Sequence, residues 1–483
     1  MRIPEHMMAL SRRRLLQLTA GLAAARALPA TAAVPREVDI VVIGAGAAGL
    51  AAARRIAAAG RKVVVLEATA VVGGRCYTDA STFAVPFERG ARWLYNPDVN
   101  PLVKLARSTA VDLVSAPQGQ KIRIGRRNAR AGEAEEFLAT LVRANRAIDD
   151  AARRGDIACA AVIPKDLREW AGTVEFLLGA AGTGKDLKDL SVMDGSRSQH
   201  RDIGSAPRLG LGALMAKLGE GLPIMPGTPA TRIVWSNREA SVETPSGTIT
   251  ARAAIVTAST SVLASGKIRF APELPKRQLD ALAQLSLGSY DRIALDLPGN
   301  PLGLARDDVV IEQSNDARTA LLSANVGGSS LCLVDIGGGF GRDLSAQGEA
   351  AMIAFAIEWL TKLFGSDIAA AVKRSTATRW NAEPYVLGAM SAAAPGGAAG
   401  RRVLAEPLGA LFLAGEATSE TDFGTVAGAW DSGERAADAA LKKIGPAKES
   451  EPARPARGER RSRQRQPQAA APPPRSSFFG FGN

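Results

Sequence analysis

Three glycines and one acidic residue near the start of the chain have the types and spacing of a nucleotide-binding turn. Gly44, Gly46 and Gly49 form the pattern GxGxxG, and Glu67 lies 18 positions after Gly49. The first glycine permits a tight turn, the second lets a pyrophosphate approach main-chain N–H groups, and the third permits close packing of a helix. An acidic residue at about 20 positions further on binds ribose hydroxyls in such sites. The pattern therefore favours a dinucleotide site.

The elements around these residues must be a strand, a helix and a second strand if the glycines are to hold phosphates. Residues 39–43 are apolar and β-branched, residues 50–59 are rich in alanine without a breaker, and residues 62–66 are a second apolar run. Phosphates would then lie at a helix N-terminus, where unpaired N–H groups and the dipole favour anions. GxGxxG by itself could also be a plain glycine-rich turn. The strand, helix, second strand and acidic residue all follow at the expected spacing, which favours the nucleotide site.

Two stretches that follow carry further groups suited to a flat, phosphorylated cofactor. Gly73 and Gly74 let the main chain pass close to a ligand, and Arg75 can place a guanidinium on a pyrophosphate. Residues 88–93 again place glycine and small residues where backbone could run beside a ring. The candidate cofactor residues in this part of the chain are Gly44, Gly46, Ala48, Gly49, Glu67, Ala68, Gly74, Arg75, Gly90, Ala91, Arg92 and Trp93.

These motifs together resemble the N-terminal part of the flavin-dependent amine oxidase family, which includes monoamine, polyamine and L-amino-acid oxidases. Residues 411–416, a strand that ends in Gly-Glu, and residues 424–437, a glycine-rich helix start, resemble a later segment of the same family. The resemblance implies FAD rather than NAD, and the sequence has no second strand-linked GxGxxG. It also implies an α/β fold in which a Rossmann-type FAD-binding domain carries an inserted α+β substrate-binding domain.

The resemblance assigns further cofactor contacts to Ala230, Gly415, Glu416, Thr425 and Val426. The main chain at Ala230 would hold the adenine, and the Glu416 carboxylate would accept hydrogen bonds from ribityl hydroxyls. A helix that starts at Thr425 would direct its positive end toward flavin N1 and O2, where reduction places negative charge. Ala389 stands where monoamine oxidases attach FAD through cysteine, so the resemblance implies non-covalent FAD.

For the reaction, the resemblance suggests Arg292, Trp380, Tyr385, Met390 and Thr425 as residues that line the substrate pocket or the flavin ring. Many family members have a lysine at the position of Arg292, bonded through water to flavin N5 and linked to oxygen reduction. Arginine keeps its charge, which argues against fast use of O2. A salt-bridged arginine away from the flavin is the equal alternative. Met390 and Thr425 replace the aromatic walls of the monoamine oxidase cage, which favours a polyamine-like or unclassified substrate.

The function that the resemblance implies is FAD-dependent oxidation of an amine. Hydride would leave the α C–H of the amine for flavin N5, the imine would hydrolyse, and electrons would pass to O2 or to a periplasmic carrier. Two alternatives stay open: a desaturase or dehydrogenase of the same fold that acts on C–C or C–O bonds, and a non-catalytic exported flavoprotein. The sequence determines neither the substrate nor the oligomeric state.

The two ends of the chain differ from its body. Residues 1–33 contain Arg12 and Arg13, an alanine-rich apolar segment and a small-residue cleavage pattern, and they resemble a twin-arginine export signal. A disordered basic N-terminus is the alternative. The segment is too short for a permanent membrane span, so we expect export of the folded protein by the twin-arginine translocation machinery to the periplasm or beyond. Residues 446–483 are basic and rich in proline, which is typical of disorder.

The domain boundaries follow from these motifs and from the resemblance. The FAD-binding domain is predicted to comprise residues 37–95, 207–285 and 380–445, and the substrate-binding domain to comprise residues 96–206 and 286–379. Two other glycine-rich stretches are poor nucleotide sites. Residues 179–185 have Walker-A spacing, but Asp186 stands where a Ser or Thr must reach magnesium, and residues 337–341 favour a plain strand-to-helix loop.

Charge, cysteine and histidine usage exclude several other classes. The net charge of +12 belongs to the ends, because residues 1–36 carry +5 and residues 442–483 carry +7, so the neutral body gives no argument for a nucleic-acid partner. Three cysteines far apart predict no disulfide framework. We see no metal-ligand pattern, and His200 favours a structural role over a catalytic one. Residues 133–153 and 167–178 are predicted to be helices.

Overall fold

The structure is a computed structural model, and it describes residues 34–198, 201 and 203–446. The predicted export signal, the basic tail and His200 lie outside the described residues, so the predictions made for them stay predictions. Among the helices that are described, we find none with the length and apolar character needed to cross a bilayer.

The predicted nucleotide-binding unit is confirmed as strand, glycine turn, helix and strand. β1 (Glu37–Ile43) leads into α2 (Ala47–Ala58), and β2 (Val63–Leu66) then pairs in parallel with β1. Branched valine and isoleucine side chains fill both faces of the strands, and alanines let the helix lie close above them. This sequence therefore folds locally as its pattern predicts.

A long strand, β13 (Gly247–Val256), is the centre of the eight-stranded sheet that β1 and β2 belong to. One edge of β13 pairs in parallel with β1, while the other edge pairs first with β12 (Ala240–Thr244) and then with β20 (Leu411–Leu413). Pairing on both edges keeps this whole stretch extended as one strand. The remaining strands are β10 (Ile224–Met225), β11 (Arg232–Trp235) and β14 (Arg269–Ala271).

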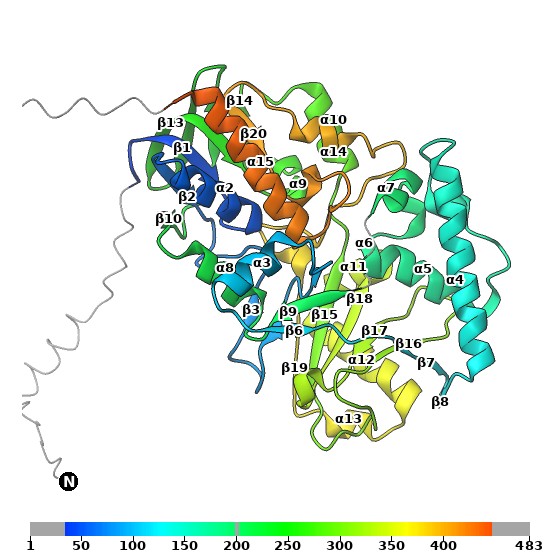
Figure 1. The fold of residues 1–483 in the computed structure, drawn as a ribbon. Helices are drawn as coiled ribbons and strands as arrows, with labels where there is room; N and C mark the ends of the chain where they lie inside the picture. Colours follow the sequence, from blue (N-terminus) through cyan, green and yellow to red (C-terminus); the bar gives the residue numbers. More distant parts are fainter. Residues whose placement is uncertain (1–33, 199–200, 202, 447–483) are drawn as a thin grey trace, which may run out of the picture. The chain divides into compact units, whose positions relative to one another are not determined.

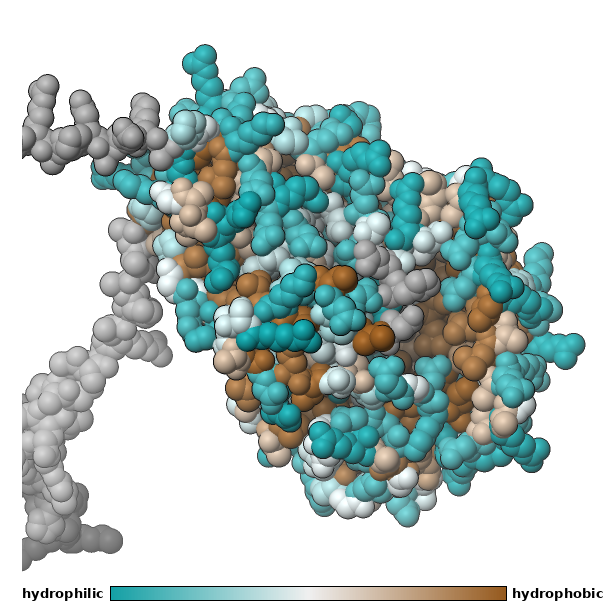
Figure 2. All heavy atoms as spheres, in the orientation of Figure 1, coloured by the Kyte–Doolittle hydropathy of each residue, from teal (hydrophilic) through white to brown (hydrophobic). Residues whose placement is uncertain are grey.

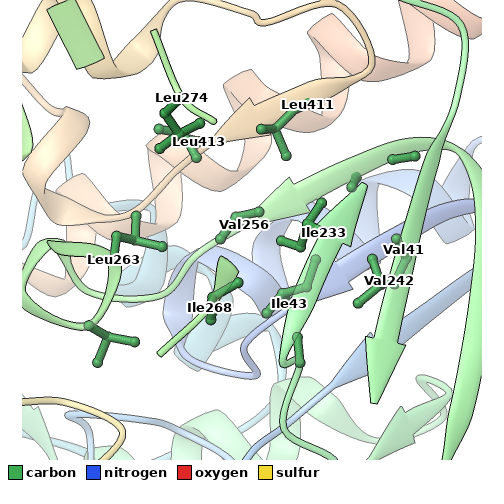
Figure 3. Packing of buried hydrophobic residues seen from close by; sticks show 14 of the residues in the cluster. Val41, Ile43, Ile233, Val242, Val256, Leu263, Ile268, Leu274, Leu411 and Leu413 are labelled. Carbon is green, nitrogen blue, oxygen red and sulfur yellow. The ribbon is translucent and has the colours of Figure 1, made fainter. Parts of the chain in front are cut away.

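Buried hydrophobic side chains cover both faces of this sheet. Figure 3 shows one face, where Val41, Ile43 and Val256 of the sheet meet Leu263 and Leu274 from the segments above it. The other face packs on α2 and on α15 (Val426–Ile444), which lie side by side (Figure 1). The two helices approach closely because Gly433 has no side chain: a Cβ there would lie 2.0 Å from the Ala48 carbonyl oxygen.

The second large sheet has seven strands and is mostly antiparallel, in the order β19-β15-β18-β17-β16-β7-β8. The helix α12 (Glu349–Phe364) covers one face of it through a separate hydrophobic core (Figure 1). Its strands are β7 (Lys121–Ile124), β8 (Arg127–Asn128), β15 (Tyr290–Asp296), β16 (Val309–Glu312), β17 (Leu321–Ser323), β18 (Leu331–Gly337) and β19 (Arg374–Ala377).

The glycine run after β18 differs from its prediction as a loop. Its residues 338–341 form the first turn of a helix, α11 (Gly338–Ala346), whose first residue has a φ of +67° that glycine adopts without strain. The chain can therefore turn from strand directly into helix, and no free loop is left to hold a ligand.

The helical region of residues 131–197 is partly as predicted. α4 (Ala131–Ala152) confirms the helix expected at 133–153. The helix expected at 167–178 is broken into a 3-10 turn, a short helix α5 (Ala171–Glu175) and a π-helical turn. Gly172, within α5, lets this helix pack against distant backbone, because a Cβ there would meet the Asp316 carbonyl oxygen at 2.0 Å.

The two sheets draw their strands from alternating parts of the chain. Strands of the first sheet come from residues 37–66, 224–271 and 411–413, and strands of the second come from 121–128 and 290–377. A small third sheet joins β5 (Leu94–Tyr95), β9 (Gly204–Pro207) and β6 (Leu113–Ser115). On the face shown in Figure 2, protruding side chains are mostly hydrophilic and hydrophobic ones gather in recessed areas.

Candidate active site

A cavity of about 1110 Å³ brings together the segments that the sequence singles out. Its wall includes the glycine turn, the double-glycine segment, the start of β11, strand β15 and the N-terminus of α15. The five candidates for the reaction, Arg292, Trp380, Tyr385, Met390 and Thr425, all line it. The cofactor candidates also line it, with the exception of Gly49.

The three glycines of the turn have different physical tasks. Gly44 has a φ of +103°, and a Cβ there would lie 2.5 Å from Thr257 Oγ1. Gly49 faces the turn itself, since its Cβ would lie 1.8 Å from the Gly44 carbonyl oxygen. At Gly46 a Cβ would meet nothing nearer than the Gly73 carbonyl oxygen at 3.8 Å. Gly44 and Gly49 are therefore required by packing, whereas Gly46 leaves space on the cavity side, where a phosphate could approach.

Glu67 fastens this turn. Its Oε2 accepts a hydrogen bond from Ala45 N at 2.8 Å, and its Oε1 accepts from the amide and the hydroxyl of Thr69, each at 2.8 Å. A carboxylate oxygen can accept two hydrogen bonds. Oε2 therefore keeps capacity for a ribose hydroxyl, and Glu67 both shapes the turn and faces the ligand space.

Glu416 joins three segments of the site. Its Oε1 accepts from Arg75 Nη1 at 2.8 Å and from Ser391 N at 3.1 Å, while its Oε2 accepts from Ser391 Oγ at 2.6 Å and Gly424 N at 2.8 Å. Burial raises the pKa of Glu416, but Arg75, Ser391 and Arg401 outweigh burial and lower that pKa to about 2. The carboxylate is therefore ionised, and protein donors already contact both of its oxygens. The predicted contact between Glu416 and ribityl hydroxyls stays a prediction.

A second ion pair lies directly behind Glu416. Arg401 and Asp194 are each 1% exposed, and the guanidinium Nε and Nη2 lie 2.7 Å from the two carboxylate oxygens. Arg401 Nη1 also donates to Ser391 Oγ at 3.0 Å, and its guanidinium lies 3.7 Å from the centre of the Phe423 ring. This buried pair holds the serine that contacts Glu416.

The helix expected to start at Thr425 is present as α15, and Thr425 is its N-cap. Thr425 Oγ1 accepts from Gly428 N at 3.0 Å and donates to the Asp422 carbonyl oxygen at 2.7 Å. The first N–H groups of a helix have no partner within it. Thr425 and Val426 both line the cavity, so the positive end of a 19-residue helix faces the ligand space.

Flat side chains form another part of the wall. Trp380 is fixed by hydrogen bonds from its backbone N to Asp291 Oδ1 at 2.8 Å and from its indole N–H to the Arg89 carbonyl oxygen at 2.9 Å. Its ring edge lies where a Cβ on Gly90 would come within 3.1 Å. Tyr385 lines the cavity with 44% of its surface exposed. The wall thus presents a rigid aromatic edge and a more open one.

Arg292 lies on the cavity side of β15 in a tight ion pair. The strand register places it opposite Asp335 of β18, with Nε 2.7 Å from Oδ1 and Nη2 3.1 Å from Oδ2. Burial lowers the pKa of Arg292, but the Asp335 charge outweighs burial and the net pKa lies above the ordinary value. Tyr290, two residues earlier on the same face, donates to Asp335 Oδ2 at 2.8 Å. The alternative that Arg292 forms a salt bridge is therefore confirmed as far as its pairing with Asp335 is concerned. Arg292 nevertheless also lines the cavity.

Several cavity residues were missed by the sequence interpretation: Tyr95, Arg201, Thr257, Tyr290, Ser323 and Asp335. The spacing of Tyr290 from Arg292 could have indicated a shared strand face. Nothing in the sequence indicates the others, because they reach the cavity through strand register and packing. The part of the chain that the structure describes contains no group of three or more His, Cys, Asp or Glu residues able to hold a metal ion.

These features fit a dinucleotide that carries a flat ring. Two helix N-termini, α2 and α15, open on one cavity; Gly46 leaves a phosphate-sized approach; and Arg75 lies between the turn and the late segment, donating to the Ala389 carbonyl oxygen at 2.7 Å. The position of Ala389 offers no thiol for a covalent link.

Comparisons with known proteins agree with this geometry. A profile of the family described as flavin containing amine oxidoreductase matches residues 185–441, more than half of the chain, and a profile of NAD(P)-binding Rossmann-like domains matches residues 42–107. Lysine-specific histone demethylase 2 from Homo sapiens is 26% identical over 447 residues, which cover 83% of this chain and 53% of the demethylase. Polyamine oxidase 4 from Oryza sativa subsp. japonica is 26% identical over 443 residues, covering 84% of this chain and 89% of the oxidase. The chain thus spans about half the length of the demethylases it matches.

Solved structures share the fold. Cyclohexylamine oxidase from Brevibacterium oxydans IH-35A superposes with a TM-score of 0.72 at 20% identity, covering 85% of this chain and all of that chain. Wild-type putrescine oxidase bound to putrescine superposes with a TM-score of 0.67 at 19% identity, covering 83% of this chain and 98% of the other.

Proposed function

We propose, from the premise that this chain belongs to the flavin containing amine oxidoreductase family, that it is an FAD-dependent enzyme that oxidises an amine. The observation that carries the proposal is the single cavity on which the glycine turn, Arg75 and the N-terminus of α15 converge beside the Trp380 and Arg292 walls. The Rossmann-type fold with a second, inserted sheet supports it. The FAD is bound without a covalent link.

The residues that would hold FAD are Gly46, Gly74 and Arg75 at the pyrophosphate, Glu67 at the ribose, the main chain at Ala230 at the adenine, and Thr425 and Val426 at the pyrimidine edge. When bound, FAD supplies a two-electron acceptor for the hydride of the α C–H. The protein places the amine, neutral at nitrogen, against the ring and keeps water away from it. Trp380, fixed by two hydrogen bonds, gives that pocket a rigid wall, and Met390 lines it.

The product is an imine, which hydrolyses to an aldehyde or ketone. The final electron acceptor is O2 or a periplasmic carrier, and the permanent charge of Arg292 argues against fast use of O2. The decisive experiment is an amine panel assayed in parallel with O2 and with an artificial one-electron acceptor. Bleaching of the flavin by amines under anaerobic conditions supports the proposal. A yellow protein that dithionite reduces, but that no amine reduces, would instead be a non-catalytic flavoprotein.

The alternative function is a desaturase or dehydrogenase of the same fold. The Arg292–Asp335 pair and the absence of aromatic side chains at Met390 and Thr425 are the observations that favour it. Anaerobic bleaching by alcohols or by saturated acids, with no bleaching by amines, would establish it.

We also propose that residues 1–33 direct export of the folded protein and that the domain boundaries are those predicted. Replacement of Arg12 and Arg13 by lysine should leave the protein in the cytoplasm when cells are fractionated. Periplasmic recovery of that variant would contradict the proposed route.

A further inference from the structure

Three of the four described carboxylates that line the cavity are already engaged by protein groups. Four described carboxylates line it, at Glu67, Asp335, Glu383 and Glu416. Glu67 holds the glycine turn, while Asp335 and Glu416 are ion-paired with arginines at 2.7 and 2.8 Å. Glu383 is exposed at the surface. An ammonium group of a polyamine would therefore find no uncommitted carboxylate on the inner wall formed by the described residues.

Arg92 presents the opposite situation. Its side chain lines the cavity and lies 4.5 Å from the centre of the Trp93 ring, and the described carboxylates include none within ion-pair distance of it. Burial, together with the neighbouring Arg292 charge, lowers the pKa of Arg92 to about 10, so it stays protonated at neutral pH. Arg92 is partly buried, and a partly buried cation without an ion-pair partner is costly. A ligand anion would remove that cost.

Glu88 does not neutralise Arg92. The Glu88 carboxylate accepts from Leu211 N at 2.6 Å and from Thr78 Oγ1 at 2.8 Å, which fixes it at the start of another helix. Burial raises the pKa of Glu88 to about 7, so it carries only part of a negative charge at neutral pH. Asp335 and Asp307 also raise the pKa of Arg92, but each is already paired with another arginine, and the net pKa of Arg92 stays below the ordinary value.

A second arginine lines the same cavity. Arg201 donates to two backbone carbonyl oxygens, of Gly182 at 3.2 Å and of Phe423 at 2.7 Å, and its guanidinium lies 5.9 Å from the centre of the Tyr95 ring. Burial lowers the pKa of Arg201, although Tyr95, Glu416 and Asp422 act in the opposite direction. Tyr95 and Tyr290 add hydroxyl groups to the same lining. Cations and hydroxyl donors are the groups that bind a carboxylate.

We propose that the substrate is an amine that also carries a carboxylate, as an amino acid does, and that Arg92 binds this carboxylate with Arg201 beside it. This inference rests on the proposed function and names its substrate class. It replaces the polyamine-like substrate that Met390 and Thr425 favour by sequence, because a second ammonium group would be repelled by the arginines. Arg92 thus belongs to substrate binding rather than to the cofactor contacts assigned to it by resemblance.

The test compares amines that differ only in the carboxylate: cadaverine with lysine, and phenethylamine with phenylalanine. In any of these pairs that the FAD-loaded enzyme oxidises, we expect the KM of the amino acid to be at least about tenfold lower than the KM of the plain amine. The reason is that the plain amine lacks the carboxylate and so loses a charged hydrogen bond. Arg92→Gln should raise KM for the acid by about 10- to 100-fold with kcat nearly unchanged. Arg92→Lys should fall between, since it keeps the charge and loses the planar fork. Equal or better use of the plain amines by the wild type would overturn the proposal.

A binding measurement separates this inference from the proposed function. Benzoate has a carboxylate and no amine, and we expect it to shift the flavin spectrum and raise the melting temperature of the wild type, with about tenfold or weaker binding to Arg92→Gln. Arg143→Gln is the control, since Arg143 is an exposed arginine paired with Asp166, and it should bind benzoate normally. Benzoate binding without reduction by any amine would refute the proposed function and leave only the carboxylate site at Arg92 supported. Reduction by amines without benzoate binding would support the proposed function and overturn this inference. If Arg92→Gln fails to fold, the comparison of amines with amino acids on the wild type, together with the KM values of Arg92→Lys, tests the proposal.

Discussion

Glu416 gives the sharpest prediction for the folded state, because one carboxylate joins three distant segments. Replacement by glutamine keeps the size of the side chain and removes its charge. The pKa of Glu416 falls from an ordinary value of 4.5 to about 2, which corresponds to roughly 3 kcal/mol of folding free energy. Since the folded-state pKa is lowered, this contribution is fully present above pH 4.5 and is lost as the pH falls toward 2.

We therefore expect Glu416→Gln to be less stable than the wild type by about 3 kcal/mol at pH 7 and by roughly half that difference at pH 3. For a body of about 400 residues, the difference at pH 7 corresponds to a melting temperature lower by roughly 4 °C. The measurement is thermal or denaturant unfolding of both proteins at the two pH values, with FAD content recorded in each preparation.

The matched control is Glu420→Gln. Glu420 lies four residues later, pairs with Arg402 at 2.9 Å and is largely exposed, so its removal should cost less than about 1 kcal/mol. Two results would contradict this argument. One is a difference in unfolding free energy between Glu416→Gln and the wild type that is as large at pH 3 as at pH 7. The other is a difference at pH 7 no larger than that of Glu420→Gln.

Three further changes test other parts of the structure. Arg292→Lys should raise the rate at which the reduced enzyme reacts with O2 in stopped-flow measurements, because lysine can give up a proton; an unchanged rate would remove this side chain from reoxidation. Gly433→Ala should cost about 3 kcal/mol or more and reduce FAD retention, since the new Cβ would meet the Ala48 carbonyl oxygen at 2.0 Å; wild-type unfolding would contradict that packing. Arg401→Met should cost about 3–5 kcal/mol by leaving Asp194 buried without its partner, and the added change Asp194→Leu should recover part of this loss; no recovery would indicate that the two charges do not act as a pair.

Local sequence determined the elements whose contacts lie close along the chain. The strand, turn and helix from Glu37 to Ala58 formed as predicted because β-branched residues, glycines and alanines each favour one backbone conformation there. The N-cap at Thr425 was predictable for the same reason, since its hydroxyl reaches an amide only three residues away. The local pattern did not predict where distant backbone packs, as Asp316 does against Gly172 inside α5.

Only the tertiary structure decided which charges meet. Arg292 pairs with Asp335 across 43 positions because β15 and β18 align in one register, and Arg75 reaches Glu416 across 341 positions because two segments close on one cavity. Arg92 is left without a carboxylate by the same packing. Residue types and their spacing in the sequence therefore predict the local structure of each segment. Charge pairing, burial and the sign of the electrostatic potential in the cavity depend instead on how segments far apart in the chain are brought together.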